Sequence, residues 1–241
     1  MMRQCAIAVL ALLLHQLGAA QTWQTVKPAE LMAMLDASAA KYKAYNAYHL
    51  TSNLYAYHNS TDPRPAEEAI SQVWKDGNKA KAEHMGMVSY QNEDLRVSID
   101  PEERLMMIAE PQDFFGLLGQ EYRESVFQAA AITRADLPDG ARFRAKFGPG
   151  SDYELIEFKF DKAGWLRRME THWGQPIALA PDNPMTALIT PMVVLEMGVP
   201  QRIAPGSVVV DPSVAVRIVK GKPVVAQAYT GYELIDNRVH Q

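Results

Sequence analysis

The stretch from Leu95 to Ala109, LRVSIDPEERLMMIA, most constrains what this chain can fold into. Its first part alternates the apolar residues Leu95, Val97 and Ile99 with polar ones, the period of two that is typical of a strand with one wet face. Its second part, from Arg104 onward, is apolar on both faces. Such a strand needs cover on both sides, so we predict a curved sheet whose inner face is also covered.

The first 20 residues have the pattern of a secretory signal peptide. Arg3 gives a short basic start, an apolar run extends from Cys5 to Leu14, and small residues at Gly18 to Ala20 form a cleavage pattern. The alternative is a buried N-terminal helix. The run is shorter than the ~20 residues that a membrane-spanning helix needs. We therefore expect export to the periplasm, cleavage after Ala20, and a mature chain with neither a transmembrane segment nor a cysteine.

Composition and motifs argue against several classes of function. The net charge of −4 argues against nucleic acid and against anionic membrane surfaces as partners. There is no GxSxG elbow, no phosphate-binding GxxxxGK loop and no HExxH motif. We expect no metal, no cofactor and no enzymatic activity. The histidines of the mature chain fit none of the usual zinc spacings: His49, His58, His84, His172 and His240.

Periodicity predicts a helix followed by a run of strands. Leu31, Leu35 and Tyr42 mark one face of an amphipathic helix over 29–44. The strands that follow are joined by short turns, which predicts an antiparallel meander. These strands are expected at 47–57, 69–75, 79–85 and 87–91, followed by the pair within 95–109.

The second half of the chain changes period more than once. Residues 112–131 have helical spacing. Their first part, the apolar stretch from Phe114 to Gly119 that is broken by two glycines, is either a lid over a hollow or an ordinary covering helix. Asn183-Pro184 and Thr190-Pro191 each resemble a helix start, which predicts short helices over 185–189 and 192–197. Further strands are expected at 142–147, 153–160, 165–173, 208–210, 214–219 and 224–235.

Flexible and aromatic apolar residues are abundant. The chain has twelve methionines, ten tyrosines, seven phenylalanines and four tryptophans, which suit a pocket for apolar chains but also an ordinary core. If the sheet encloses a hollow, we expect side chains of the helix and strands to line it and an aromatic segment to cover it. The candidates for this ligand-binding cavity are Leu35, Leu54, Trp74, Met85 and Met107, with Phe114 and Phe115 as the cover.

The order of these elements resembles a known family. A leader, an amphipathic helix ending in tyrosines, a Tyr-rich strand, a DGN hairpin and LRVSIDPEERLMMIAEP resemble the LolA/LolB-like periplasmic lipoprotein-carrier superfamily, and FKFDKAGWLRRMETHWG is similar to its second hairpin. The resemblance implies an incomplete barrel closed by helices around an apolar cavity for lipid acyl chains. This chain departs from the pattern at 112–150 and after Gly174, and the family's lid arginine has no assigned counterpart.

We therefore predict an α+β fold, an incomplete antiparallel β-barrel whose strongly curved sheet has helices on its concave side. Residues 21–241 are expected to form a single domain. The leading hypothesis is a monomeric periplasmic carrier or sensor that binds a lipid or lipoprotein acyl chain. The alternatives are a non-enzymatic envelope interaction module with a filled core, which would bind envelope proteins, and a hydrolase with a dispersed active site.

Overall fold

The computed structural model describes residues 22–111, 120–179 and 186–238. The expected leader, 1–20, and the expected aromatic cover, Phe114 and Phe115, lie outside the described residues.

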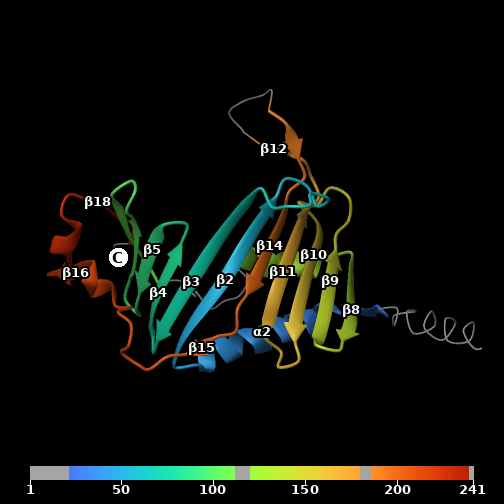
Figure 1. Ribbon diagram of the computed structural model, residues 1–241, viewed down its shortest axis with the longest axis horizontal. Coiled ribbons are helices and arrows are strands. Elements are labelled where there is room, and N and C mark those ends of the chain that lie inside the picture. The colour runs from blue at the N-terminus through green and yellow to red at the C-terminus, as the bar shows by residue number, and fades with distance from the viewer. Residues whose placement is uncertain (1–21, 112–119, 180–185, 239–241) are drawn as a thin grey trace, which may run out of the picture.

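One large curved sheet dominates the molecule (Figure 1). Its strand order is β1-β8-β9-β10-β11-β14-β2-β3-β4-β5-β6-β7-β18, and β15 also pairs with β2. The strands are β1 (Gln24–Val26), β2 (Ala47–Tyr57), β3 (Glu67–Asp76), β4 (Lys79–His84), β5 (Met87–Gln91), β6 (Arg96–Asp100), β7 (Leu105–Ala109), β8 (Ala131–Leu137), β9 (Gly140–Lys146), β10 (Tyr153–Asp161), β11 (Leu166–Trp173), β14 (Met192–Met197), β15 (Gln201–Arg202) and β18 (Glu233–Asp236).

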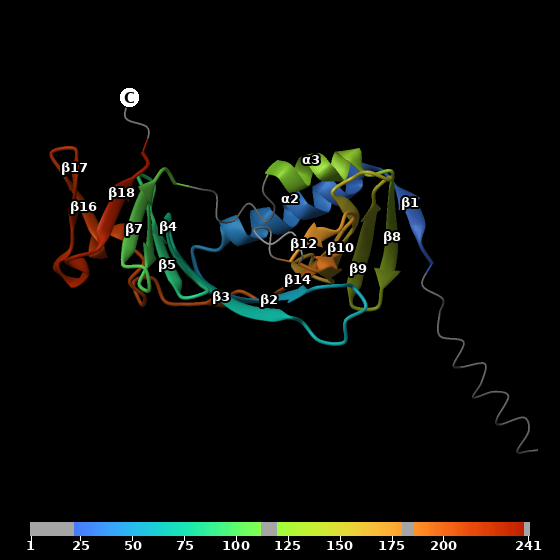
Figure 2. The ribbon, with the colours of Figure 1, turned by 90° about the horizontal axis from the view of Figure 1, so that it is seen from above.

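The sheet is strongly curved but does not close. In Figure 2 both of its ends rise on the side where the helices lie. The edge strands β1 and β18 stand at opposite ends of the strand order, so the described part of the chain forms no closed barrel. β18 runs parallel to β7, which makes the sheet mixed. The predicted curvature is confirmed, and the expectation of a purely antiparallel sheet is wrong at this edge.

Two α-helices, α2 (Pro28–Ala44) and α3 (Gln120–Gln128), are present in the described residues, and both lie over the same half of the concave side (Figure 2). Pro28 occupies the first turn of α2, where its missing N–H is not needed. The buried Ser38 hydroxyl accepts a hydrogen bond of 2.9 Å from the Leu166 N–H and fixes α2 to β11. Because far more of the described residues are in strands than in the two α-helices, the term α+β describes the fold only in part.

Two hydrophobic cores lie on opposite faces of this one sheet. The first core lies beneath α2 and includes Leu31, Leu35, Phe143, Phe158 and Phe160, all at most 1% exposed. The second core includes, from β6 and β7, Val97, Ile99, Met106 and Ile108, together with Ala215 and Val216 from the C-terminal segment. The C-terminal segment therefore covers one end of the sheet on the face away from the helices.

In the C-terminal segment the strand expected over 214–219 is β16 (Val216–Val219), whereas the other two expected strands are not formed as predicted. Gly231, at φ 83, interrupts the predicted strand over 224–235, and residues 208–210 are not in a strand. A separate two-stranded sheet precedes this segment in the chain, β12 (Ile177–Ala178) with β13 (Leu188–Ile189). The C-terminal elements before β18 are η1 (Pro212–Val214), β16 (Val216–Val219), β17 (Lys222–Val225) and η2 (Gln227–Tyr229).

The two short helices predicted over 185–189 and 192–197 are wrong. Leu188–Ile189 is β13 and Met192–Met197 is β14. β14 fills the gap between β2 and β11 and pairs with both, so its backbone finds its hydrogen-bond partners in the sheet. The β-branched Val193 and Val194 suit that position, and tertiary pairing overrides the Thr190-Pro191 helix signal.

Candidate functional site

The register of β2 to β7 shows which side chains share the helix-side face. Directly opposed residues of an antiparallel pair point to the same face, and Leu50 of β2 belongs to the first core beneath α2. Its partner on β3 is Val73, and the pairing continues from strand to strand as far as β7. We call the resulting row the strip: Val73, Ala82, Ser89, Ser98 and Met107.

The strip lies opposite the second core on the same strands. Val97 and Ile108 pair with each other and are fully buried, whereas Ser98 and Met107, one step along their strands, face the helix side and are half-buried. The strand predicted to be apolar on both faces is β7. One face of β7 belongs to the second core, and Met107 on its other face is the last residue of the strip.

The strip contains no charged residue. Ser89 and Ser98 are hydrogen-bonded to each other, with 2.9 Å between their hydroxyl oxygens, so the two polar groups satisfy one another. Five strands spaced about 4.8 Å apart make the strip about 19 Å long. Figure 2 shows α2 and α3 over the other half of the sheet, and no described helix lies over β5 to β7. The strip therefore presents small and apolar side chains in a row across the sheet.

A neighbouring row on the same face carries two cations and no anion: Lys75, Ala80, Gln91, Arg96 and Ala109. The Lys75 ammonium donates to the carbonyl oxygens of Lys43, at 2.9 Å, and Tyr45, at 2.7 Å, where α2 ends. Burial lowers the pKa of Lys75. This row runs beside the strip, and Lys75 at its β3 end contacts the C-terminal end of α2.

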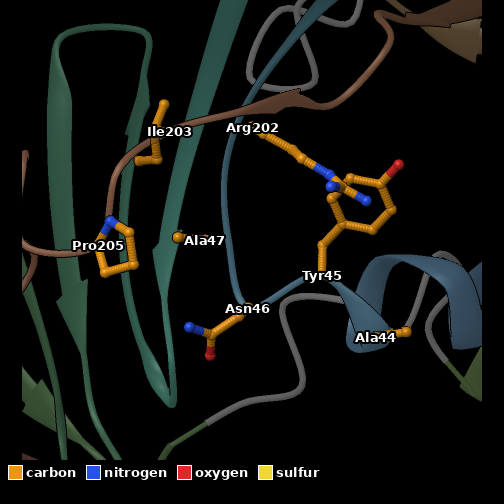
Figure 3. Close-up of a pocket in the computed structure, with 7 residues that line it drawn as sticks. All are labelled: Ala44, Tyr45, Asn46, Ala47, Arg202, Ile203 and Pro205. Carbon is orange, nitrogen blue, oxygen red and sulfur yellow. The ribbon is translucent and has the colours of Figure 1, made fainter.

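A pocket of about 470 Å³ opens where α2 passes into β2 (Figure 3). β15 pairs Arg202 with Tyr48 of β2, which directs Arg202 toward α2. Its guanidinium carbon lies 5.1 Å from the centroid of the Tyr45 ring, a cation–π distance. The pocket therefore combines an apolar wall with one cation. Its lining residues are Ala44, Tyr45, Asn46, Ala47, Arg202, Ile203 and Pro205.

The aromatic residues next to this pocket are packed rather than reactive. The Tyr42 ring lies edge-on to Trp165 with 4.7 Å between centroids, and Tyr45 lies 5.6 Å from the same indole. Burial raises the pKa of Tyr42 to about 12, so its hydroxyl stays neutral. That hydroxyl has no hydrogen-bond partner among the described residues. The cluster fixes the end of α2 and offers no nucleophile.

The structure divides the predicted cavity residues. Met107 belongs to the strip. Leu54 is half-buried on the helix side opposite Ala69, whereas Leu35 is 1% exposed and part of the first core. Leu35 therefore packs against other side chains of this protein.

Two predicted cavity residues lie elsewhere. Trp74 faces the other side of the sheet, where its ring stacks on His49 with 4.8 Å between centroids. Met85 is 66% exposed in the β4–β5 turn, where its φ is 48°. Register explains Trp74, because it is one residue from Val73 and a single step reverses the face. Phe114 and Phe115 lie outside the described residues.

Sequence reasoning missed most of the strip and the pocket cation. Small residues such as Ala82, Ser89 and Ser98 give no hydropathy signal, and they are joined only by strand pairing. Arg202 lies in a two-residue strand that no pattern marks. The alternation of Val73 with Trp74 was the available signal, but it does not show which face is inside.

The face of β9, β10, β11 and β14 that lies opposite the first core is densely charged. Glu157 pairs with Arg142 and Arg144, at 3.2 Å and 2.6 Å, and Arg168 pairs with Glu170 at 2.9 Å. The hydrogen bond from His172 lowers the pKa of Glu170 to about 2. The described residues contain no group of three or more His, Cys, Asp or Glu side chains that could hold a metal ion.

Within residues 22–111, 120–179 and 186–238, no helix is long and apolar enough to cross a bilayer.

Comparison with known proteins gives structural matches only. No protein-family model matches the sequence, and no curated protein matches it. Solved structures similar to this chain include a LolA superfamily protein from Nitrosomonas europaea, as the resemblance in the sequence predicts; it has a TM-score of 0.31 and 9% identity, over 72% of this chain and 93% of that one.

Two further solved structures are similar to this chain. An uncharacterized conserved protein from Thermus thermophilus has a TM-score of 0.43 and 10% identity, over 86% of this chain and 99% of that one. A DUF1329 family protein from Desulfovibrio piger has a TM-score of 0.29 and 8% identity, over 78% of this chain and 97% of that one. Because all three TM-scores are below 0.5, the function is argued from this chain's own residues.

Proposed function

We propose that this protein is a non-enzymatic periplasmic carrier or sensor that binds a lipid or lipoprotein acyl chain along the strip. One observation carries the proposal: the face of β3 to β7 opposite the second core bears an uncharged row of small and apolar side chains. A sheet face left to water normally alternates to polar and charged residues. This row has no charged residue, and its two polar side chains, Ser89 and Ser98, hydrogen-bond to each other, so it fits an apolar occupant.

The surroundings of the strip suit an amphipathic ligand. An acyl chain along the strip would leave a polar head near the neighbouring row, where Lys75 and Arg96 attract negative charge. The mutual hydrogen bond of Ser89 and Ser98 removes the need for polar partners on the ligand. The occupant we propose is therefore a single acyl chain with an anionic head.

The energy required is modest. Micromolar affinity corresponds to about 8 kcal/mol. At about 25 cal/mol per Å² this corresponds to about 330 Å² of apolar surface removed from water, before the cost of ordering the chain is included. An acyl chain that contacts five strands on one side reaches an area of this order.

The test is uptake of a fluorescent fatty acid by wild type and by the Ala82→Trp variant. The indole at position 82 would cross the middle of the strip and displace the chain. We expect uptake to weaken at least about tenfold, equivalent to about 1.4 kcal/mol of binding free energy. The melting temperature should change by no more than about 3 °C, because position 82 lies outside both packed cores.

The matched control is Glu83→Trp, one residue along the same strand. Its side chain points to the opposite face and forms an ion pair with Lys81. The control should take up the probe as wild type does. Equal uptake by Ala82→Trp and wild type would contradict the strip as the binding site.

A second candidate function, an envelope interaction module, has its own support. The small sheet of β12 and β13 projects beyond the ends of the central strands of the main sheet (Figure 1) and exposes Ile177, Leu179 and Leu188, the last at 71%. Exposed aliphatic side chains on a projecting hairpin are typical of a protein-binding surface. If wild type takes up no apolar probe, this function replaces the carrier.

A further inference from the structure

The outward face of the β16–β17 hairpin has an unusual composition. Val216 and Val225 oppose each other and point into the second core. The alternate positions point away from it. We call these outward side chains, with the lysine of the turn, the basic hairpin face: Arg217, Val219, Lys222, Val224 and Lys220.

Two valines of the basic hairpin face are left in the open. Val219 and Val224 are each 50% exposed, and Ile218, near the turn, is 38% exposed. Val219 and Val224 point away from the second core and are not part of it, whereas Ile218 lies on the inward side of the hairpin with Val216. The tight turn fixes their position, because Lys220 and Gly221 both have positive φ, at 52° and 77°.

The charged residues of the hairpin segment itself are all cations. From residue 212 to residue 232 the chain has three cations and no Asp or Glu, although the whole chain carries a net charge of −4. Arg217 shares a pocket with Asp94 and Asp211, which partly balances its charge. Lys220 and Lys222, at the turn, form no ion pair with any described residue. The turn therefore presents two cations beside exposed aliphatic groups.

This combination identifies the occupant by its chemistry. A symmetric contact with a second copy would place like charges against each other, which opposes self-association. Nucleic acid requires a larger basic stripe than a four-residue turn provides. An anionic lipid surface satisfies both features, because aliphatic side chains enter the headgroup boundary while lysines reach phosphate oxygens.

We propose that the basic hairpin face docks the protein on lipid bilayers that carry anionic headgroups. The whole-chain charge argues against such a surface, but the cations are concentrated at one end of the sheet, and the field there falls off within about a Debye length of 8 Å at physiological salt. The attraction to an anionic bilayer therefore depends on the cations of the basic hairpin face and not on the net charge of the whole chain.

The test is cosedimentation of the protein, expressed from the full chain, with phosphatidylcholine vesicles that contain or lack phosphatidylglycerol. Wild type should bind the anionic vesicles, and binding should weaken with added salt. The double variant Lys220→Gln and Lys222→Gln should bind about 30-fold more weakly, since each cation near an anionic surface contributes about 1 kcal/mol. Lys146→Gln with Lys162→Gln, exposed lysines on the other half of the sheet, is the control and should bind as wild type.

A second pair of substitutions tests the aliphatic contribution. Val219→Thr with Val224→Thr keeps the β-branched shape but adds hydroxyl groups, and it should also weaken vesicle binding while circular dichroism shows a folded protein. Equal binding to neutral and anionic vesicles, or binding unchanged in the Lys220→Gln, Lys222→Gln variant, would overturn the proposal. Fatty-acid uptake without vesicles is measured in parallel, so that a failure of docking is distinguished from a failure of the strip.

Discussion

Each of the two hydrophobic cores covers one face of its half of the sheet, and the opposite faces of the two halves differ in composition. On the face opposite the first core, β9, β10, β11 and β14 carry ion pairs such as Glu157 with Arg144 and Arg168 with Glu196. Behind the second core, β3 to β7 carry the strip. Charged side chains such as these are typical of a sheet face that is exposed to solvent. The second face has the same position relative to its core but lacks charged groups in its central row.

The difference shows how one sheet provides two kinds of surface. Side chains alternate between the two faces along every strand. Because the core lies on one face in one half of the sheet and on the other face in the other half, the face that is left outside the core also changes. The helices cover the inside of one half, and the C-terminal segment covers the outside of the other half. No described helix covers the inside of that second half near β5 to β7, which is where we propose that an apolar ligand binds.

The largest expected effect tests the first core. Leu35→Asp would bury an unpaired carboxylate beneath α2, where Leu35 is 1% exposed, and should lower the free energy of unfolding by about 4 kcal/mol or more. Chemical denaturation measures this. Ala37→Asp puts the same charge on the exposed face of the same helix and should cost less than about 1 kcal/mol. Similar losses in both variants would show that α2 is not docked.

The next effect compares the two faces of β7 directly. Ile108→Ala removes a fully buried side chain of the second core and should cost about 3 kcal/mol. Met107→Ala, one residue away on the strip, should cost less than about 1 kcal/mol because Met107 is only half-buried. Denaturant midpoints of the two variants measure the difference. A larger loss at Met107 than at Ile108 would mean that the faces are assigned the wrong way round.

A smaller effect concerns the charged outer face. The pKa of Glu170 is lowered to about 2, first by the His172 hydrogen bond and then by Arg168, so its carboxylate stabilises the fold above its ordinary pKa of 4.5, and this stabilisation is lost as the pH falls toward 2. Glu170→Gln should abolish about 2 kcal/mol of this pH dependence, allowing for screening at a partly exposed site. Unfolding curves measured at several pH values test it; parallel pH profiles for wild type and variant would contradict it.

Most strands could be predicted from the sequence because local alternation and turn residues define them. The strand expected over 47–57 is β2, and the strand expected over 87–91 is β5. β8 and β14 were missed because competing signals, helical spacing before Ala131 and Thr190-Pro191, outweighed short strand patterns. Only pairing with distant strands reveals both of them.

The candidate site was less predictable because it depends on register and on which face is covered. Met107 was predicted from its apolar strand. Trp74 was predicted on size, although its neighbour Val73 is the strip residue. The reversal of the core between β2 and β5 has no local signature, because it is set by where the C-terminal segment packs, more than 100 residues further along the chain.

The smallest effect tests whether charge helps to hold the helical half together. Arg123 of α3 donates to the carboxylate of Asp36 on α2 at 2.7 Å, with both side chains exposed. Exposed ion pairs contribute about 0.5 kcal/mol, because solvent screens them and two long side chains lose freedom. A double-mutant cycle with Asp36→Ala and Arg123→Ala should therefore give a coupling energy near that value, and high salt should reduce it further. A coupling above about 2 kcal/mol would mean that the helices are held by this pair rather than by the burial of Leu31, Leu35 and Val126.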